Sequence, residues 1–249
     1  MKLKLFLLFC LCICCYFLIT YEKSNNKKTD TQPQMNIIKR SFNDNNYTIY
    51  IIENILTDDE CNTIMHQSIP HLKRSGTISK NSVSNTRTSY NTFLKHDMFQ
   101  KEKDTIAYAH STLSILDKID NICVNISKKP KVNQEPLQVV RYQKSQYYNP
   151  HYDCCVPIES DLCKQDYTNG GFRYSTLLIY LNDVEDGGET EFPLINFKMK
   201  PKRGCGIYFF NVTKSENTFH KLSKHAALPL QKGEKWVCNK WIRCKKYVY

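Results

Sequence analysis

Three residues of the sequence have the types and spacing that suit a metal centre. His151 and Asp153 stand two residues apart, so on a β-strand their side chains point to the same side. His225 follows 74 residues after His151 and offers a second imidazole. Two imidazoles and one carboxylate form the facial set that binds non-haem Fe(II) and leaves positions open for substrate and O₂. The pattern therefore indicates iron-dependent oxidation chemistry.

The His151–Asp153 pair does not establish a metal site by itself. The chain contains seven histidines, and His-x-Asp spacing arises by chance in many chains of average composition. A histidine packed in the core or lying on the surface is the alternative for His151. The surrounding sequence has to decide between the two interpretations.

The elements that must position these residues change in character at Pro136. Before it, residues 57–60 have the form of a capping box, and residues 61–69 carry apolar side chains at helical spacing. A second helix is predicted over residues 103–125. After Pro136, short apolar segments bounded by glycine and proline predict strands. Helices followed by strands indicate an α+β fold, which we expect to be a sandwich or open barrel with helices packed outside. The predicted strands are residues 137–142, 176–181, 206–210 and 236–242.

The N-terminal residues 1–21 predict a membrane segment. An uncharged run of 17 residues follows two early lysines, and as a helix it would span about 26 Å, close to the hydrocarbon thickness of a bilayer. We expect a signal anchor that serves as a transmembrane segment, with a cleaved signal peptide as the alternative. Residues 22–45 are polar and predict a linker. Residues 46–249 are expected to form the folded domain.

The cysteines favour an oxidising compartment. The chain has twelve, and eight of them follow the apolar segment; an even number behind a membrane-targeting segment suggests a lumen and some disulfides. Cys154, Cys155 and Cys163 lie between Asp153 and Arg173. We expect a disulfide to staple this loop at the mouth of the site. A zinc site is the rival interpretation, but no fourth ligand has suitable spacing.

Charge and composition narrow the function classes. The formal net charge is +11, but it is spread along the chain without a basic run, a phosphate-binding loop or zinc-finger spacing, so nucleic-acid binding is not expected. A basic surface suits an acidic or extended polypeptide, or a membrane face. Three sequons mark candidate N-glycosylation sites in a secreted chain, at Asn46, Asn125 and Asn211.

From about residue 52 to residue 243 the chain resembles a prolyl 4-hydroxylase catalytic domain of the short, single-domain type found in plants, algae and large DNA viruses. Each matching piece is short, and their shared order and spacing make the resemblance specific. The matching pieces are 51–56 (IIENIL), 87–89 (RTS), 137–142 (LQVVRY), 150–153 (PHYD), 173–176 (RYST), 180–184 (YLNDV), 187–193 (GGETEFP), 225–229 (HAALP), 233–236 (GEKW) and 239–242 (NKWI).

The resemblance implies a double-stranded β-helix, or jelly roll, with flanking N-terminal helices. It also implies that His151, Asp153 and His225 bind iron, and that Lys235 pairs with the distal carboxylate of 2-oxoglutarate. A dicarboxylate in a pocket needs such a cation, because an unpaired buried charge is costly. The resemblance further assigns Tyr142, Tyr180 and Thr190 to co-substrate binding, and Tyr142, Arg173 and Trp241 to substrate binding.

Several of these residues have a structural alternative. Lysines are usually solvated, but on a strand Lys235 would share one face with Val237 and Trp241, which favours a lysine that faces a pocket. Tyr180 and Trp241 also suit core packing. Thr190 and Arg173 also suit a structural role, or a supporting role in which they do not contact the substrate or co-substrate directly.

The implied reaction is hydroxylation of peptidyl proline at C4, coupled to decarboxylation of 2-oxoglutarate to succinate and CO₂. The implied cofactors are Fe(II), 2-oxoglutarate, O₂ and ascorbate. The implied partner is a proline-rich or collagen-like polypeptide substrate, and no obligate second subunit is expected.

We expect the catalytic domain to be luminal, in the endoplasmic reticulum membrane or secretory pathway, with a lid over residues 77–90. The alternatives are the same chemistry on lysine, asparagine or a free amino acid, a silent peptide-binding module, or an anchored structural protein. Many relatives carry a cysteine where this chain has Leu228.

Overall fold

The larger sheet of the protein positions most of the site. In the computed structural model the described residues are 34–42, 46–76, 85–100, 107–157 and 159–248, and residues 35–249 form one unit. Eight strands make this sheet, in the order β1-β2-β11-β7-β14-β5-β4-β3. They are β1 (Asn36–Phe42), β2 (Tyr47–Glu53), β3 (Lys73–Arg74), β4 (Tyr90–Leu94), β5 (Leu137–Tyr142), β7 (Arg173–Tyr180), β11 (Gly206–Phe210) and β14 (Lys235–Arg243).

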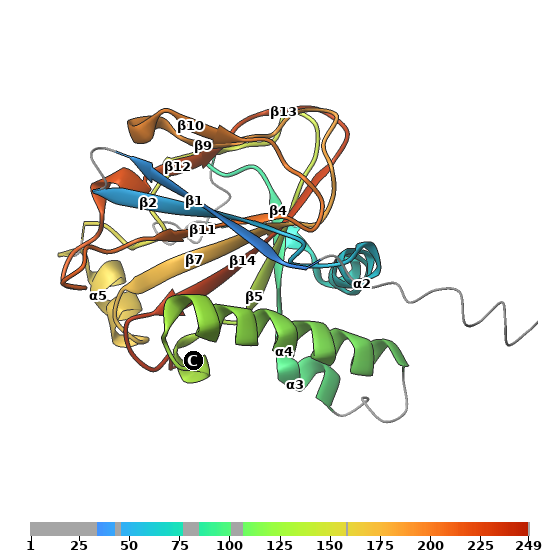
Figure 1. Ribbon diagram of the computed structural model, residues 1–249, viewed down its shortest axis with the longest axis horizontal. Coiled ribbons are helices and arrows are strands. Elements are labelled where there is room, and N and C mark those ends of the chain that lie inside the picture. The colour runs from blue at the N-terminus through green and yellow to red at the C-terminus, as the bar shows by residue number, and fades with distance from the viewer. Residues whose placement is uncertain (1–33, 43–45, 77–84, 101–106, 158, 249) are drawn as a thin grey trace, which may run out of the picture. The chain divides into compact units, whose positions relative to one another are not determined.

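A smaller sheet packs over one face of the larger one (Figure 1). Its order is β10-β9-β12-β6, and a separate two-stranded sheet pairs β13 with β8. Phe192 of β9 meets Phe209 of β11 with ring centroids 5.0 Å apart, so aromatic side chains join the two layers. The strands of these sheets are β6 (Tyr148–His151), β8 (Asp186–Gly187), β9 (Thr190–Phe192), β10 (Phe197–Met199), β12 (His225–Ala227) and β13 (Leu230–Lys232).

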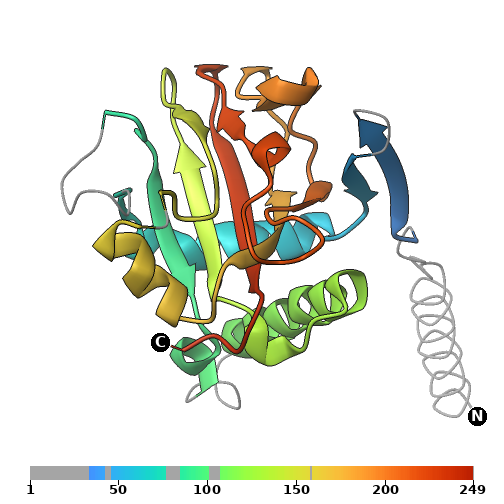
Figure 2. The ribbon, with the colours of Figure 1, turned by 90° about the vertical axis from the view of Figure 1, so that its left-hand side faces the viewer.

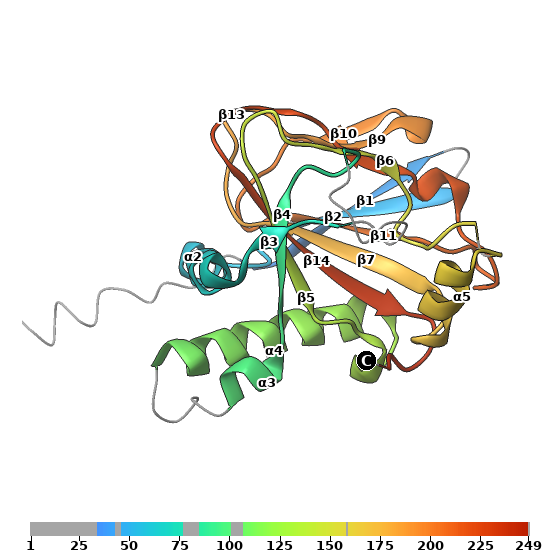
Figure 3. The same cartoon turned by 180° about the vertical axis from the view of Figure 1, so that it is seen from behind.

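Helices cover the other face of the larger sheet (Figures 1 and 3). The first begins after Thr57, whose side chain and Glu60 form the expected capping box in both directions. The longest helix buries Ile115, Leu116 and Ile119 toward the sheet, as the apolar stripe requires. The α-helices are α2 (Asp58–Ser68), α3 (His96–Gln100), α4 (Ala107–Ser127) and α5 (Asp161–Thr168), and the 3₁₀ turns are Ile69–His71, Lys131–Asn133, Pro193–Ile195 and Lys221–Ser223.

Strand alternation divides the main core into two large clusters, beside which Cys154, Phe172 and Val212 form a third, smaller one. In β7, Leu177 and Ile179 belong to the cluster under the helices, whereas Leu178 and Tyr180 belong to the cluster between the sheets. This follows from the period of two along a strand. Both faces of the sheet are therefore buried, and β5 and β14 run side by side through its middle (Figure 2). The side chains of β5, β7 and β14 that face the smaller sheet are placed to line a site.

The predicted elements after Pro136 are confirmed. Residues 137–142 and 206–210 are β5 and β11, and the predicted strand 236–242 lies within β14. The predicted strand 176–181 overlaps β7 but extends one residue beyond its end at Tyr180. The helix predicted over residues 103–125 corresponds to α4 over the described part of that range. The α+β assignment holds.

The expected linker is wrong in part. Residues 36–42, placed within the linker, form β1 and pair along their whole length with β2. The strand was missed because most of its side chains are exposed, so it lacks an apolar alternation; backbone pairing to β2 holds it. The predicted anchor, residues 1–21, lies outside the described residues, as does much of the expected lid (77–84). Among the residues that are described, no helix is both long enough and apolar enough to cross a bilayer.

Candidate metal centre and active-site cavity

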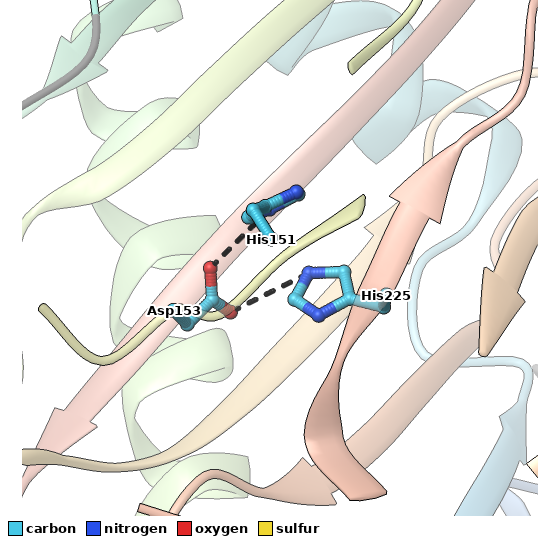
Figure 4. A group of neighbouring side chains, drawn as sticks. All are labelled: His151, Asp153 and His225. Atoms are coloured by element: carbon cyan, nitrogen blue, oxygen red, sulfur yellow. Dashed lines mark ion pairs between the residues drawn. The ribbon is translucent and has the colours of Figure 1, made fainter. Parts of the chain in front are cut away.

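His151, Asp153 and His225 converge on one point (Figure 4). His151 ends β6 and is the register partner of His225, which begins β12. Asp153 lies just past the end of β6, so the turn after the strand, rather than a continuous strand, brings its carboxylate to the same side. Nε2 of His151 is 3.9 Å from Oδ1 of Asp153, and Nε2 of His225 is 3.8 Å from Oδ2. One candidate ligand atom from each residue falls within 4.8 Å of the others.

Hydrogen bonds behind the three side chains orient them toward this point. Nδ1 of His151 lies 2.8 Å from the carbonyl oxygen of Asn149, and Nδ1 of His225 lies 2.9 Å from that of Ser223. A carbonyl only accepts, so each Nδ1 carries the proton and each Nε2 presents a lone pair. Oδ2 of Asp153 accepts a 2.6 Å hydrogen bond from Thr176. Supporting bonds of this kind are what metal-binding histidines and carboxylates require.

The local electrostatics favour the metal-binding protonation states. Burial lowers the pKa of His151 to about 3, and the neighbouring His225 acts in the same direction, so the His151 imidazole is neutral. Burial alone would raise the pKa of Asp153, but His225, His151 and Arg173 together hold it below its usual value. A neutral imidazole beside an ionised carboxylate is ready to bind a divalent cation.

A cavity of about 970 Å³ opens next to these residues and extends to Lys235. Lys235 begins β14 and is 1% exposed. Its Nζ donates a 2.6 Å hydrogen bond to the carbonyl oxygen of Gly188. Within the described chain, no carboxylate lies in salt-bridge range of that ammonium, and burial lowers the pKa of Lys235 to about 7. Among the described residues the Lys235 ammonium therefore has no ion-pair partner in contact, and the more distant Glu189 carboxylate offsets only part of the effect of burial on its pKa.

The turn that faces Lys235 needs glycine. Gly187 and Gly188 have φ values of +71° and +70°, which side chains on L-residues rarely adopt. A Cβ at Gly188 would also stand 3.0 Å from Leu230 and 3.4 Å from the Lys235 side chain. The tight turn predicted here is confirmed, and it lets the Gly188 carbonyl approach the ammonium.

The other predicted site residues divide into two groups. Tyr142, Thr190, Arg173 and Trp241 line the cavity. Tyr180 does not: it is fully buried and its hydroxyl donates a 2.9 Å hydrogen bond to Oγ1 of Thr190. The Tyr180 hydroxyl thus supports Thr190, and its ring centroid lies 5.8 Å from Nζ of Lys235.

Arg173 and Trp241 form one unit at the cavity. The Arg173 guanidinium lies 3.5 Å from the centroid of the Trp241 ring. It is paired with Glu135 at 2.7 Å and donates to the carbonyl oxygen of Asp153 at 3.3 Å. Arg173 thus connects the wall made by Trp241 to the strand end that carries Asp153.

Tyr148 and Arg87 were not among the predicted site residues, yet both line the cavity. The Tyr148 ring stacks on His151 with centroids 3.5 Å apart and an interplanar angle of 17°. The Arg87 guanidinium lies 4.9 Å from the Tyr148 ring centroid. Tyr148 precedes His151 by three residues, which on a regular strand points it to the other face, so spacing gave no signal for it. Arg87 arrives from a distant segment and was visible only within the 87–89 motif.

The expected staple is present as a disulfide between Cys155 and Cys163. Cys154 is buried and free. Asn211 of the third sequon is fully buried and its amide donates to Thr176, so glycosylation there is incompatible with this fold. The remaining cysteines of the described chain, Cys61, Cys123, Cys205, Cys238 and Cys244, are free.

Comparisons with known proteins agree with this geometry. The family model described as the 2OG-Fe(II) oxygenase superfamily matches residues 137–243. A protein of Acanthamoeba polyphaga mimivirus named as a prolyl 4-hydroxylase is 43% identical over 128 residues, covering 51% of this chain and 52% of its own length. Prolyl 4-hydroxylase 2 of Arabidopsis thaliana is 30% identical over 223 residues, covering 80% of this chain and 68% of its own. The chain belongs to the prolyl 4-hydroxylase family.

A solved structure extends the likeness to the fold of the prolyl 4-hydroxylase family. The viral collagen prolyl hydroxylase of Paramecium bursaria Chlorella virus-1, in its 2OG complex, superposes with a TM-score of 0.57 at 29% identity. The match covers 78% of this chain and 94% of that one. The double-stranded β-helix expected from the sequence is therefore confirmed. By contrast, the alignment spans only about half the length of the mimivirus relative.

Membership in a 2OG-Fe(II) oxygenase family implies Fe(II), 2-oxoglutarate and O₂, with ascorbate typical of the family. The residues present fit the first two. The lone pairs of His151 and His225 and the Asp153 carboxylate form the facial donor set that Fe(II) takes. The Lys235 ammonium, which donates to the Gly188 carbonyl and contacts no carboxylate of the described chain, fits a carboxylate of the co-substrate.

Proposed function

We propose that this domain hydroxylates peptidyl proline at C4 while it converts 2-oxoglutarate and O₂ to succinate and CO₂. The observation that carries the proposal is the presence, in one cavity, of a three-ligand iron set and of a buried ammonium without a carboxylate partner. The first suits the metal and the second suits the far end of a dicarboxylate. Neither is explained by packing alone, because burying an unpaired cation destabilises the fold.

Each side chain then has a defined task. His151, Asp153 and His225 hold Fe(II), whose bound form supplies the redox chemistry with O₂. Lys235 binds the distal carboxylate and so orients the ketoacid end toward the metal, and Thr190, held by Tyr180, adds a hydroxyl in the same cavity.

The remaining cavity wall receives the substrate. Tyr142, Arg173 and Trp241 line it, and the Arg173 guanidinium stacked over the Trp241 ring gives this wall a planar surface against which a prolyl ring can pack. A proline-rich or collagen-like polypeptide in an extended polyproline conformation can enter such a cavity without breaking internal hydrogen bonds.

The test is succinate release with Fe(II), 2-oxoglutarate, ascorbate and collagen-like or poly-proline peptides, with a gain of 16 Da located by mass spectrometry. The expected result is hydroxyproline from wild type and its loss in His151→Ala. His71→Ala, a substitution of an exposed histidine outside the cavity, serves as the control and should match wild type. Oxygen found on lysine or asparagine would assign the same chemistry to another target. Equal, negligible turnover in wild type and His151→Ala would indicate a silent binding module.

We further propose that residues 1–21 anchor the protein in the endoplasmic reticulum membrane, or elsewhere in the secretory pathway, with the catalytic domain in the lumen. The Cys155–Cys163 disulfide supports this, because such bonds persist in oxidising compartments. Carbonate extraction and protease protection of the full chain in microsomes test the proposal. Extraction into the soluble fraction, or digestion without detergent, would contradict it.

A further inference from the structure

Two buried polar side chains form a hydrogen-bonded chain that ends at the carboxylate of Asp153. Thr176 of β7 donates a 2.6 Å hydrogen bond to Oδ2 of Asp153, and the Asn211 amide donates a 2.8 Å hydrogen bond to Oγ1 of Thr176. Thr176 is 1% exposed and Asn211 is fully buried. Because β7 pairs with both β11 and β14 (Figure 1), and Asn211 directly follows β11, both side chains belong to the middle of the larger sheet.

The carboxylate determines the direction of these hydrogen bonds. A carboxylate that binds a metal is ionised and can only accept. The single hydroxyl proton of Thr176 therefore points to Asp153, and the Thr176 oxygen offers Asn211 only its lone pairs. Asn211 has to turn the NH₂ group of its amide, rather than the oxygen, toward Thr176. An asparagine is suited to this task because it donates without adding a charge next to the metal ligands.

The Asn211 side chain is not explained by the stability of the fold. Its Oδ1 atom is buried and accepts no hydrogen bond from the described chain. A buried acceptor without a donor destabilises a protein, whereas an apolar side chain of similar shape does not. The hydrogen bond from Asn211 to Thr176 supplies a reason for asparagine that packing alone does not.

The backbone of Asn211 also connects to a histidine of the iron set. Its carbonyl oxygen accepts a 2.7 Å hydrogen bond from the backbone N–H of His220. The carbonyl oxygen of His220 accepts from the backbone N–H and the hydroxyl of Ser223, at 2.9 and 2.7 Å. The Ser223 carbonyl oxygen in turn accepts from Nδ1 of His225 at 2.9 Å. Two hydrogen-bonded paths therefore meet at Asn211, one from Asp153 and one from His225.

We propose that Asn211 is a positioning residue of the iron centre: its side chain holds the Asp153 carboxylate through Thr176, and its backbone holds the segment that carries His225. Asn211 does not line the cavity, so it acts only through these neighbours. The inference rests on the metal centre of the proposed function and is independent of which substrate is hydroxylated. Groups that orient metal-binding side chains typically change metal affinity by about 10- to 100-fold.

The experiment removes each polar group of the chain and measures metal binding. Asn211→Leu and Thr176→Val should each raise the Kd for Fe(II) about tenfold in anaerobic equilibrium dialysis. Thr176→Ser keeps the hydroxyl and should stay within about twofold of wild type. Without metal, the melting temperature of Asn211→Leu should lie within about 4 °C of wild type, because the variant loses one hydrogen bond but also the unpaired acceptor.

Asn133→Leu is the matched control. Asn133 is also buried, and its amide donates a 2.9 Å hydrogen bond to the carbonyl oxygen of Arg243, away from the iron set. Its replacement should lower the melting temperature and leave the Kd for Fe(II) unchanged. Visible absorption of the Co(II)-loaded protein is a second readout, because these bands follow the geometry of the ligand atoms. The bands of Asn211→Leu and Thr176→Val should shift, and those of Asn133→Leu should not.

The outcomes separate this inference from the proposed function. If wild type binds Fe(II) stoichiometrically and Asn211→Leu keeps the wild-type Kd and Co(II) spectrum, the positioning role is wrong and the proposed function stands. Should Asn211→Leu not fold, the Thr176 variants decide, and equal Kd values for Thr176→Val and Thr176→Ser overturn the inference. If wild type binds no Fe(II), the proposed function is contradicted and this inference falls with it.

Discussion

Replacing Lys235 by methionine tests the contribution of the ammonium to 2-oxoglutarate binding separately from that of the other cavity residues. Methionine has similar length and no charge, and the Gly188 carbonyl is the one hydrogen-bond acceptor of Nζ among the described residues. Removing one partner of a buried charge-assisted pair costs about 3 kcal/mol, which corresponds to roughly a 150-fold loss of affinity. We therefore expect the KM for 2-oxoglutarate to rise about 100-fold in Lys235→Met.

The same substitution should not weaken the unliganded protein. Burial lowers the pKa of Lys235 from 10.5 to about 7, so the fold carries an electrostatic cost of a few kcal/mol at Lys235 when no anion is bound. An apolar side chain of similar volume removes that cost. The melting temperature of Lys235→Met without ligand should equal or exceed that of wild type.

The assays are succinate release against 2-oxoglutarate concentration, and thermal unfolding with and without 2-oxoglutarate. Lys232→Met, which changes an exposed lysine three residues earlier, is the control. A Lys235→Met enzyme whose KM stays within threefold of wild type would refute the assignment of the ammonium. So would a large loss of stability in the unliganded state, because it would mean that the cation supports the fold rather than a ligand.

Four further outcomes follow from the structure. Because the Lys235 ammonium loses its proton above a pKa of about 7, KM for 2-oxoglutarate should rise with pH above 7 and flatten below it; a flat profile from pH 6 to 9 would argue against the pairing. His225→Ala should abolish tight Fe(II) binding in equilibrium dialysis, and retained stoichiometric binding would exclude it as a ligand. Glu135→Gln leaves two buried arginines without their shared carboxylate, which should cost about 3–5 kcal/mol and lower the melting temperature by about 10 °C; a drop under 2 °C would contradict that accounting. Thr57→Ala removes the capping box and should cost about 1 kcal/mol in denaturant unfolding, whereas Thr63→Ala in the same helix should cost less.

The sequence was sufficient for those elements that carry a continuous apolar run or a helix-capping signal. Strands β5, β7 and β14 carry buried residues on both faces, and α2 carries a complete capping box, so local pattern and final structure agree. β1 was missed because its exposed side chains carry no pattern and its stability comes from pairing with β2. An exposed edge strand of this kind can be predicted only together with the strand that it pairs with.

For the site, the sequence identified the candidate ligand-binding residues better than the residues that support them. Residue type and spacing suggested the iron set, and the resemblance to the prolyl 4-hydroxylase family selected it together with Lys235. The Glu135 carboxylate shared by Arg173 and Arg243 depends on three segments meeting in space, and the Tyr148 ring reaches His151 because the strand departs from regular alternation. These contacts are products of tertiary packing, which no short motif encodes.

The placement of β14 in the sheet has a consequence for the order in which the protein folds during synthesis. This strand is made after its neighbours, yet it lies between β5 and β7 and bonds to both. It also carries Lys235, Trp241 and Arg243 along its length. Until β14 is synthesised, the edges of β5 and β7 that pair with it are unpaired, and the cavity lacks the lining residues that β14 supplies. The cavity is therefore complete only once β14 pairs with both neighbours, because β14 supplies Lys235 and Trp241 to its lining.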